Sequence, residues 1–249
     1  MRTLEAASVT AEVLTRPAHT DPEVHVRAPD TAAVLAFRSG RDGTGLVVLG
    51  PRTRASYLAP GDVPRCVTIR LRPGTARAAL GVTMRALVDR TVLLRDLWGT
   101  SADTLLNRLA ARDDAEVAHE LAGALQERVR AGSAADSARA HLVDAAAGLL
   151  TGAGRVPEVA RELGVSERHL RNLFHDAVGM SPKRYARIHR VRSVLAGARE
   201  EPWAELAAET GFYDQSHLSA DFRALMGTPP GAFRAGRLPA PVPCGWSLL

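Results

Sequence analysis

Three side chains in the carboxyl-terminal half, Arg168, Arg171 and Asn172, have the chemistry and spacing to read base pairs. Arginine can bond both acceptors on the major-groove edge of guanine, and asparagine can bond adenine in the same two-point manner. These positions lie three and four residues apart, so on a helix they share one face. The competing interpretation is a solvated charged face, which is the more frequent explanation for a lone surface helix.

A second segment repeats the pattern around these side chains and weakens the solvated-face explanation. Residues 159–170 and 206–218 each contain an apolar, alanine-rich helix, a glycine turn, a capping residue and a second helix with His-Leu. Gly164 and Gly211 can adopt the positive φ that a tight turn between helices needs. The sequence therefore predicts an internal duplication of a helix-turn-helix.

The second helix of each unit is the element that would position the reading side chains. Ser166 and Asp214 are residue types that cap helix amino termini, and the apolar residues after them share one inward face. The opposite face is then free to enter a major groove. A basic helix from Pro182 to about Leu195 joins the units and carries further predicted DNA contacts: Lys183, Arg184, Arg187 and Arg190.

The motifs of the two units carry a family resemblance. They are Gly164-Val165-Ser166, Leu170, Leu173-Phe174, Gly179, Ser181-Pro182 and Tyr185 in the first unit, and Gly211 to Leu218, Phe222, Gly227, Thr228-Pro229 and Phe233-Arg234 in the second. With them, residues 138–236 strongly resemble the AraC/XylS family of bacterial transcription regulators. The resemblance implies reading helices at 166–177 and 214–226, held by the linking helix for adjacent major-groove segments.

Carried over position by position, the resemblance implies base-facing side chains on both helices: Arg168, Arg171, Asn172, Gln215, Ser216 and Ser219. The second helix departs from the family at Ala220, where many members have a basic residue, and Asp221 follows it. Residues 166–192 contain seven basic and two acidic residues, whereas residues 193–236 contain three basic and six acidic residues. Because phosphate neutralisation supplies much of DNA affinity, we expect the first unit to dominate binding.

The residues before this module predict a different architecture. Apolar runs over 32–37, 46–49 and 66–71 are separated by turn residues, which is typical of antiparallel β structure. From Thr75 the pattern changes to short and amphipathic helices that end by Arg130. The predicted fold class is α+β, with an amino-terminal β-rich domain, a cupin-like barrel or sandwich plus helices, and a carboxyl-terminal all-α double helix-turn-helix domain.

The small, polar segment 132–137 is the predicted boundary between the domains. The expected parts are an effector-sensing and dimerisation domain over 1–131 (β-rich over 1–73, helical over 75–131), the linker 132–137, the DNA-binding domain 138–236 and a tail over 237–249. The first part loosely resembles the β domain that precedes this module in many regulators. That resemblance implies a sensing or dimerising role.

Arg70 and Arg72 are the candidate effector contacts, because arginine forks match carboxylate and phosphate groups. A solvated strand face is the more frequent explanation for such alternation. His19 and His25 lack the spacing of metal ligands and are interpreted as surface residues. The sequence predicts no metal site, no cofactor and no catalytic residue.

Composition and charge set the remaining expectations. The net charge of +5 permits a nucleic-acid partner without requiring one, and two distant cysteines argue against a disulfide framework. No apolar stretch is long enough to span a membrane, and the first residues form no signal peptide, so we expect a cytoplasmic, nucleoid-associated protein. The expected partner is double-stranded promoter DNA, with RNA polymerase, a small-molecule effector and a second copy of the chain as further candidates.

The sequence leaves three functional classes open. The leading one is a sequence-specific transcription regulator without catalytic activity, dimeric through the helices near residues 101–130. An enzyme fused to such a module, for example an alkyl-transfer repair protein, would need a thiol nucleophile such as Cys66, which has no histidine base nearby in the sequence. The acidic second unit keeps open an interaction protein that binds no DNA.

Overall fold

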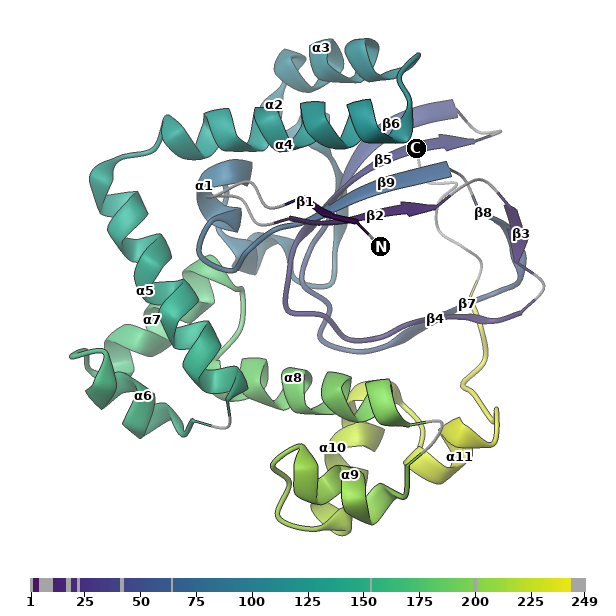
Figure 1. The fold of residues 1–249 in the computed structure, drawn as a ribbon, viewed down its shortest axis with the longest axis vertical. Helices are drawn as coiled ribbons and strands as arrows, with labels where there is room; N and C mark the ends of the chain where they lie inside the picture. Colours follow the sequence, from purple (N-terminus) through teal and green to yellow (C-terminus); the bar gives the residue numbers. More distant parts are fainter. Residues whose placement is uncertain are drawn as a thin grey trace.

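The computed structural model describes residues 2–4, 11–16, 19–21, 23–40, 43–63, 65–152, 154–198 and 201–242. The ribbon combines a β-rich amino-terminal part, helices that cover one side of it, and a helical carboxyl-terminal part (Figure 1). The side chain of His19, the thiol of Cys244 and the end of the tail over residues 243–249 lie outside the described residues.

A six-stranded antiparallel sheet, in the order β1-β2-β9-β5-β6-β10, forms the centre of the amino-terminal part. Its strands are β1 Arg2–Leu4, β2 Ala11–Arg16, β5 Val34–Gly40, β6 Gly43–Leu49, β9 Arg65–Arg70 and β10 Thr91–Leu93. Leu35, Ala36 and Phe37 of β5 are successive residues and all are fully buried. Both faces of this strand are therefore covered, which explains its unbroken apolar run.

Two smaller antiparallel pairs complete the β structure. They are β3 His19–Asp21 with β8 Gly61–Val63, and β4 His25–Arg27 with β7 Ser56–Leu58. The β4–β7 pair lies on the side of the sheet away from α3 and α4 (Figure 1). The described tail returns to this pair, because the Val242 amide donates to the Tyr57 carbonyl at 2.8 Å. The predicted β-rich amino-terminal domain is confirmed.

Short and long helices follow the sheet: α1 Ala76–Leu80, the 3-10 helix η1 Met84–Leu87, α2 Leu94–Trp98, α3 Thr100–Leu109 and α4 Asp114–Arg130. The apolar stripe of α3 and α4 is buried against the sheet at Leu105, Leu109, Val117, Leu121 and Leu125. The apolar stripe of α3 and α4 is therefore core of the amino-terminal part, and the expected dimer contact through these helices would have to use their outer faces.

The segment predicted as a linker is mostly helical. Helix α5, Ala134–Thr151, begins with a capping box in which the Ser133 hydroxyl accepts from the Asp136 amide and the Asp136 carboxylate accepts from the Ser133 amide. A Ser-x-x-Asp sequence reads equally well as a polar linker or as a helix start, and here it starts a helix. Residues 131–133 alone join α4 to α5, and Arg77 pairs with Asp136 across the connection at 3.3 Å.

Six further helices complete the carboxyl-terminal part: α6 Val156–Glu162, α7 Glu167–Ala177, α8 Pro182–Gly197, α9 Trp203–Glu209, α10 Gln215–Met226 and α11 Pro230–Arg234. A second core unites them around fully buried Leu170, Phe174, Ile188, Val191, Leu218 and Phe222. The α+β fold class, with its double helix-turn-helix, is confirmed. Within the described ranges no helix is long and apolar enough to cross a membrane.

Candidate nucleic-acid interface

The first helix-turn-helix consists of α6, a glycine turn and α7. Gly164 adopts φ +65°, and the Val165 amide closes the turn on the Ala160 carbonyl at 2.9 Å. The Ser166 hydroxyl accepts from the His169 amide at 3.1 Å, which caps α7 as its sequence predicts. Leu170 and Phe174 point inward and are fully buried. The turn and the cap thus fix how α7 leaves the domain surface.

The second unit, α9, its turn and α10, repeats this geometry. Gly211 adopts φ +76°, and the Phe212 amide donates to the Ala207 carbonyl at 3.0 Å. The Asp214 carboxylate accepts from the His217 amide at 2.7 Å and caps α10. The duplication inferred from the sequence is therefore present in local detail, including the turn hydrogen bond and the cap.

The predicted base-facing side chains lie on the outward faces of the two helices. Arg168, Arg171 and Asn172 are exposed on α7, and Gln215 and Ser216 are exposed at the start of α10, while Ser219 is half-buried. Arg171 keeps its side chain 56% exposed, and Glu167 one turn earlier contacts it twice: the carboxylate lies 3.8 Å away, and the backbone carbonyl accepts from Arg171 Nε at 3.2 Å. Such a surface pair contributes little, so the guanidinium can exchange it for another acceptor.

The basic residues of α8 divide into two groups. Lys183 and Arg184 are exposed in its first turn, where the Ser181 hydroxyl caps the helix. Arg187 and Arg190 are half-buried and lie against Asp221 of α10, with Arg187 Nε 2.6 Å from Asp221 Oδ1. Two of the four predicted α8 contacts therefore belong to a cluster inside the domain.

The surroundings of Asp221 differ most clearly from those that the sequence suggested. Its place in an acidic stretch suggested a charge at the DNA-facing surface, yet the residue is only 8% exposed. The helical period explains this, because Asp221 follows Leu218 by three residues and precedes Leu225 by four, and both are buried. Its charge is matched by arginines of α8 and so adds little to the repulsion of DNA.

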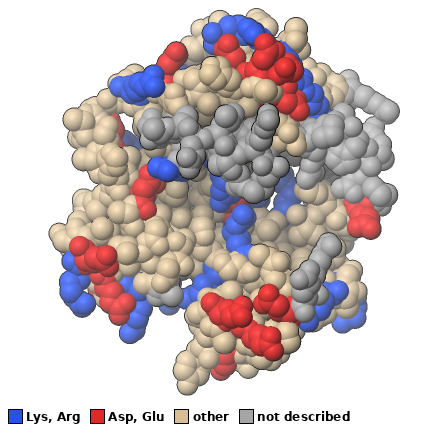
Figure 2. Space-filling view, in the orientation of Figure 1, with Lys and Arg blue, Asp and Glu red and all other residues tan. Residues whose placement is uncertain are grey.

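The remaining acidic residues of the second unit do lie at the surface. Glu205, Glu209 and Asp214 are exposed. Figure 2 shows acidic side chains gathered over the α9–α10 end of the molecule, whereas both signs alternate over the α6–α7 end. On the face that Figure 2 shows, the second unit is the more acidic one, as expected from the sequence. Asp221, Arg187, Arg190 and Arg192 take no part in this difference, because they are paired internally.

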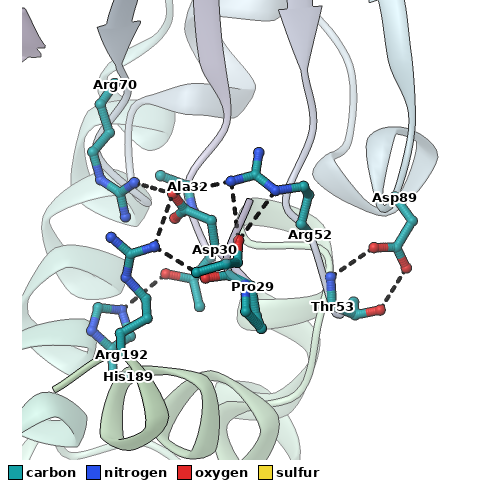
Figure 3. Close-up of polar contacts among 11 residues, drawn as sticks. Pro29, Asp30, Ala32, Arg52, Thr53, Arg70, Asp89, His189 and Arg192 are labelled. Atoms are coloured by element: carbon teal, nitrogen blue, oxygen red, sulfur yellow. Dashed lines mark hydrogen bonds and ion pairs between the residues drawn. The ribbon is translucent and has the colours of Figure 1, made fainter. Parts of the chain in front are cut away.

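A polar joint connects α8 to the amino-terminal domain (Figure 3). The Asp30 carboxylate pairs with Arg70 of β9 and with Arg192 of α8, whose nitrogen lies 3.3 Å away. Arg192 also donates to the Pro29 carbonyl at 3.0 Å, and His189 is hydrogen-bonded to the Thr31 hydroxyl at 2.9 Å. Residues near position 30 and near position 190 carry no shared sequence signal, so only the tertiary structure could identify this joint.

Burial and arginine charge determine the protonation of the joint. Burial alone would raise the pKa of Asp30, but the hydrogen bond and charge of Arg70, with the charge of Arg192, hold it below its usual range. Burial, together with the neighbouring Arg192 and Arg70, lowers the pKa of His189 to about 4. His189 is therefore neutral at physiological pH and serves as a hydrogen-bonding partner in the joint.

The two candidate effector residues lie in different surroundings. Arg70 faces the joint and is engaged by Asp30, whereas Arg72 lies beyond the end of β9 and is exposed. Among the described residues no group of three or more histidine, cysteine, aspartate or glutamate side chains could hold a metal ion.

The amino-terminal domain also touches both helix-turn-helix units. A Cβ at Gly179, directly after α7, would lie 2.8 Å from the Met84 carbonyl oxygen, so η1 packs tightly on this turn. At the other end, the Tyr57 hydroxyl donates to the Met226 carbonyl at 2.6 Å, and the Ala55 amide donates to the Leu225 carbonyl at 2.8 Å. The carboxyl ends of α7 and α10 are therefore both in contact with the amino-terminal domain.

Comparison with known proteins adds a family match for this region. Residues 159–236 match the family model described as a helix-turn-helix domain. No curated protein matches the chain in sequence.

Several solved structures are similar to parts or most of the chain. The carboxyl-terminal domain of AraT, a response regulator from Geobacillus stearothermophilus, is 23% identical over 40% of this chain and 88% of its own, with a TM-score of 0.37. A regulator with an AraC-type DNA-binding domain from Chromobacterium violaceum is 21% identical over 41% of this chain and 96% of its own, with a TM-score of 0.37. ToxT from Vibrio cholerae is 10% identical over 90% of this chain and 97% of its own, with a TM-score of 0.45.

Proposed function

Because residues 159–236 form a helix-turn-helix domain of the AraC type, we propose that this protein is a sequence-specific DNA-binding transcription regulator. It reads adjacent major-groove segments with α7 and α10. The observation that carries the proposal is the repeated geometry: two capped helices, each buried on one face, present exposed hydrogen-bonding side chains on the other. Such faces suit the donor and acceptor pattern of the major groove.

The proposed base contacts are Arg168, Arg171, Asn172, Gln215, Ser216 and Ser219, with Lys183 and Arg184 contacting phosphates. Arg187 and Arg190 are assigned to the internal cluster with Asp221, because exchanging that pairing for phosphate would leave a buried carboxylate without a partner. The first unit supplies most of the affinity, because four exposed basic side chains lie on α7 and at the start of α8, whereas the second unit exposes Glu205, Glu209 and Asp214.

The amino-terminal domain, residues 1–131, is proposed to sense a small-molecule effector and to contribute to a homodimer through a surface other than the buried stripe of α3 and α4. RNA polymerase is the proposed partner for transcriptional output, in the cytoplasm and at the nucleoid. A methyl-accepting thiol is disfavoured, because Cys66 is 8% exposed within the central sheet, where a DNA base has no access to it.

Binding by the full chain to duplexes selected from a random-sequence pool tests this function. One duplex family should resist competition by unrelated DNA, and its affinity should fall steeply with salt. Arg171→Ala should weaken selective binding, whereas Arg108→Ala on α3 should not. Arg108 is a matched control, because both side chains are 56% exposed and each has one carboxylate within 4 Å. Equal binding of all sequences, or of none, contradicts the proposal.

A further inference from the structure

The cluster around Asp221 joins three segments of the domain. From α8 come Arg187, whose Nε lies 2.6 Å from Asp221 Oδ1, and Arg190, whose nearest nitrogen lies 3.9 Å from Oδ2. From α10 itself comes His217, one turn earlier, with its Nε2 also 3.9 Å from Oδ2. The turn of the second unit contributes Phe212, whose ring lies under the Arg190 guanidinium at 5.2 Å from its centroid.

The two attachments of α8 differ in kind. Towards the first unit, Tyr185 of α8 meets Phe174 of α7 edge to face, with ring centroids 5.3 Å apart. Towards the second unit, apolar contacts are supplemented by the ion pair between Arg187 and Asp221. The apolar contacts are non-directional, whereas the ion pair is largely shielded from water and weakens when a rotation of α10 moves Asp221 away from the guanidinium.

Reading two major-groove segments requires a fixed angle and distance between the two helices that enter them. The hydrogen bond from the Tyr57 hydroxyl of the amino-terminal domain to the Met226 carbonyl restrains the carboxyl end of α10. Asp221 lies near the middle of α10 and faces α8, so its ion pair restrains the rotation of α10 about that end. A polar contact that costs desolvation can in this way specify one geometry among several.

We propose that Asp221 is a positioning residue for DNA recognition. Through Arg187, with support from Arg190, it fixes the orientation of α10 on α8 and thereby the spacing at which the two segments of DNA are read. The proposal rests on the proposed function, since it assigns how the second helix is aimed at its segment. Asp221 contacts no DNA and acts through α8.

The test uses full-length Asp221→Asn, which keeps the shape of the side chain and removes its charge. The probes are the duplex best selected by the wild-type protein and the same duplex with one base pair inserted between the two protected segments. One base pair rotates the second segment by about 35° and moves it by about 3.4 Å. For the wild-type chain we expect the insertion to weaken binding by about tenfold or more, the change that about 1.4 kcal/mol produces.

Asp221→Asn should bind the uninterrupted duplex about tenfold more weakly and should lose most of the wild-type penalty for the insertion. Arg187→Gln should act in the same way, and the exchange Arg187→Asp with Asp221→Arg should restore part of the spacing preference. The double variant Arg187→Gln with Asp221→Asn keeps the test valid if a lone buried charge prevents folding, and it should match Asp221→Asn.

The control variant is Asp176→Asn on α7, which removes an acidic charge whose side chain is 49% exposed. If only electrostatic repulsion is lost, binding to the two duplexes should strengthen by the same factor. If Asp221→Asn also changes both affinities by the same factor, the spacing preference does not depend on Asp221. Asp221 then has only an electrostatic or a structural role, and the proposal is overturned.

A measurement without DNA separates this inference from the proposed function. Spin labels at His175→Cys and Ala224→Cys, two exposed positions on α7 and α10, report the distance between the helices once Cys244 is replaced by Ser. Asp221→Asn should broaden or shift that distance distribution, and an unchanged distribution overturns the proposal. Failure to select any duplex, combined with a broadened distribution, would reject the DNA-reading function while retaining Asp221 as the residue that positions α10.

Discussion

The two helix-turn-helix units share one local design, but they differ in their contacts with α8 and in the charge of their surfaces. Each closes its glycine turn with a backbone hydrogen bond and caps its second helix with a side-chain oxygen. The first unit has a mixed surface and an aromatic attachment to α8, whereas the second has an acidic surface and an ionic attachment. A repeated fold therefore does not imply repeated energetics, and the units should respond differently to equivalent substitutions.

Helix α8 is where the difference becomes functional, because it contacts three partners. One side of α8, with Tyr185, His189 and Arg192, meets both Phe174 of the first unit and the amino-terminal domain, because the rings of Tyr185 and His189 are in contact. The opposite side, with Arg187 and Arg190, binds Asp221 of the second unit. A displacement at any one of these contacts can be transmitted to the others, since packed elements have few alternative arrangements.

The largest expected effect concerns the shared core, where the two units should behave alike. Phe174→Ala and Phe222→Ala each remove a fully buried ring and should lower the free energy of unfolding by about 3–5 kcal/mol. Chemical denaturation of the full chain measures this change. If only one variant is destabilised, or if each melts a separate transition, the units do not share a single cooperative core.

The next effect should separate the units. Arg171→Ala should reduce selective DNA affinity by about 1–3 kcal/mol, the range of a good bidentate base contact. Gln215→Ala should cost about 1 kcal/mol or less, because fewer phosphates are neutralised near α10. Titration of both variants against the selected duplex at one salt concentration measures the difference. A larger loss for Gln215→Ala would reverse the proposed order of the two units.

A smaller effect tests the contact between α8 and the amino-terminal domain. The pKa of His189 is lowered to about 4 in the fold, against about 6.5 in the unfolded chain. Between these values the unfolded chain binds more protons, so the free energy of unfolding should decrease as the pH falls from about 6.5 towards 4. The contribution of one histidine is at most about 1.4 kcal/mol per pH unit.

Stability curves of wild-type protein and His189→Gln over this range measure that contribution. The variant should show a flatter decline than the wild-type protein. Parallel curves for wild type and His189→Gln would show that the joint does not depend on a neutral His189.

The smallest effect concerns the caps, where the units should again be equivalent. Ser166→Ala and Asp214→Ala each remove the acceptor for an amide of the first helical turn and should cost about 1 kcal/mol. Thermal unfolding detects a change of this size. A much larger loss for Asp214→Ala would indicate that its carboxylate has a role beyond capping.

Local features of the molecule could be predicted from the sequence because they depend on neighbours along the chain. The turns at Gly164 and Gly211, the caps at Ser166 and Asp214 and the end of α4 at Arg130 follow from short patterns. The linker was the exception, because a Ser-x-x-Asp pattern does not distinguish a polar connection from a helix start.

Side-chain partners could be predicted less well, because they depend on distant parts of the chain. Arg187, Arg190, Lys183 and Arg184 are all basic residues of one helix, and the sequence does not distinguish them. Only Arg187 and Arg190 lie against α10. Arg70 was considered as an effector contact, whereas it binds Asp30 at the joint with α8.

The sequence by itself determined the duplicated helix-turn-helix, the β-rich domain before it and the side chains available on the outer faces of α7 and α10. The tertiary structure decided which charges are paired internally, namely Asp221 with α8 and Arg192 with Asp30. It also decided that the apolar stripe of α3 and α4 is buried against the sheet. The physical reason is that hydrogen-bonded turns and caps are fixed by a few adjacent residues. Burial and ion pairing depend on which surfaces meet when separate segments pack together.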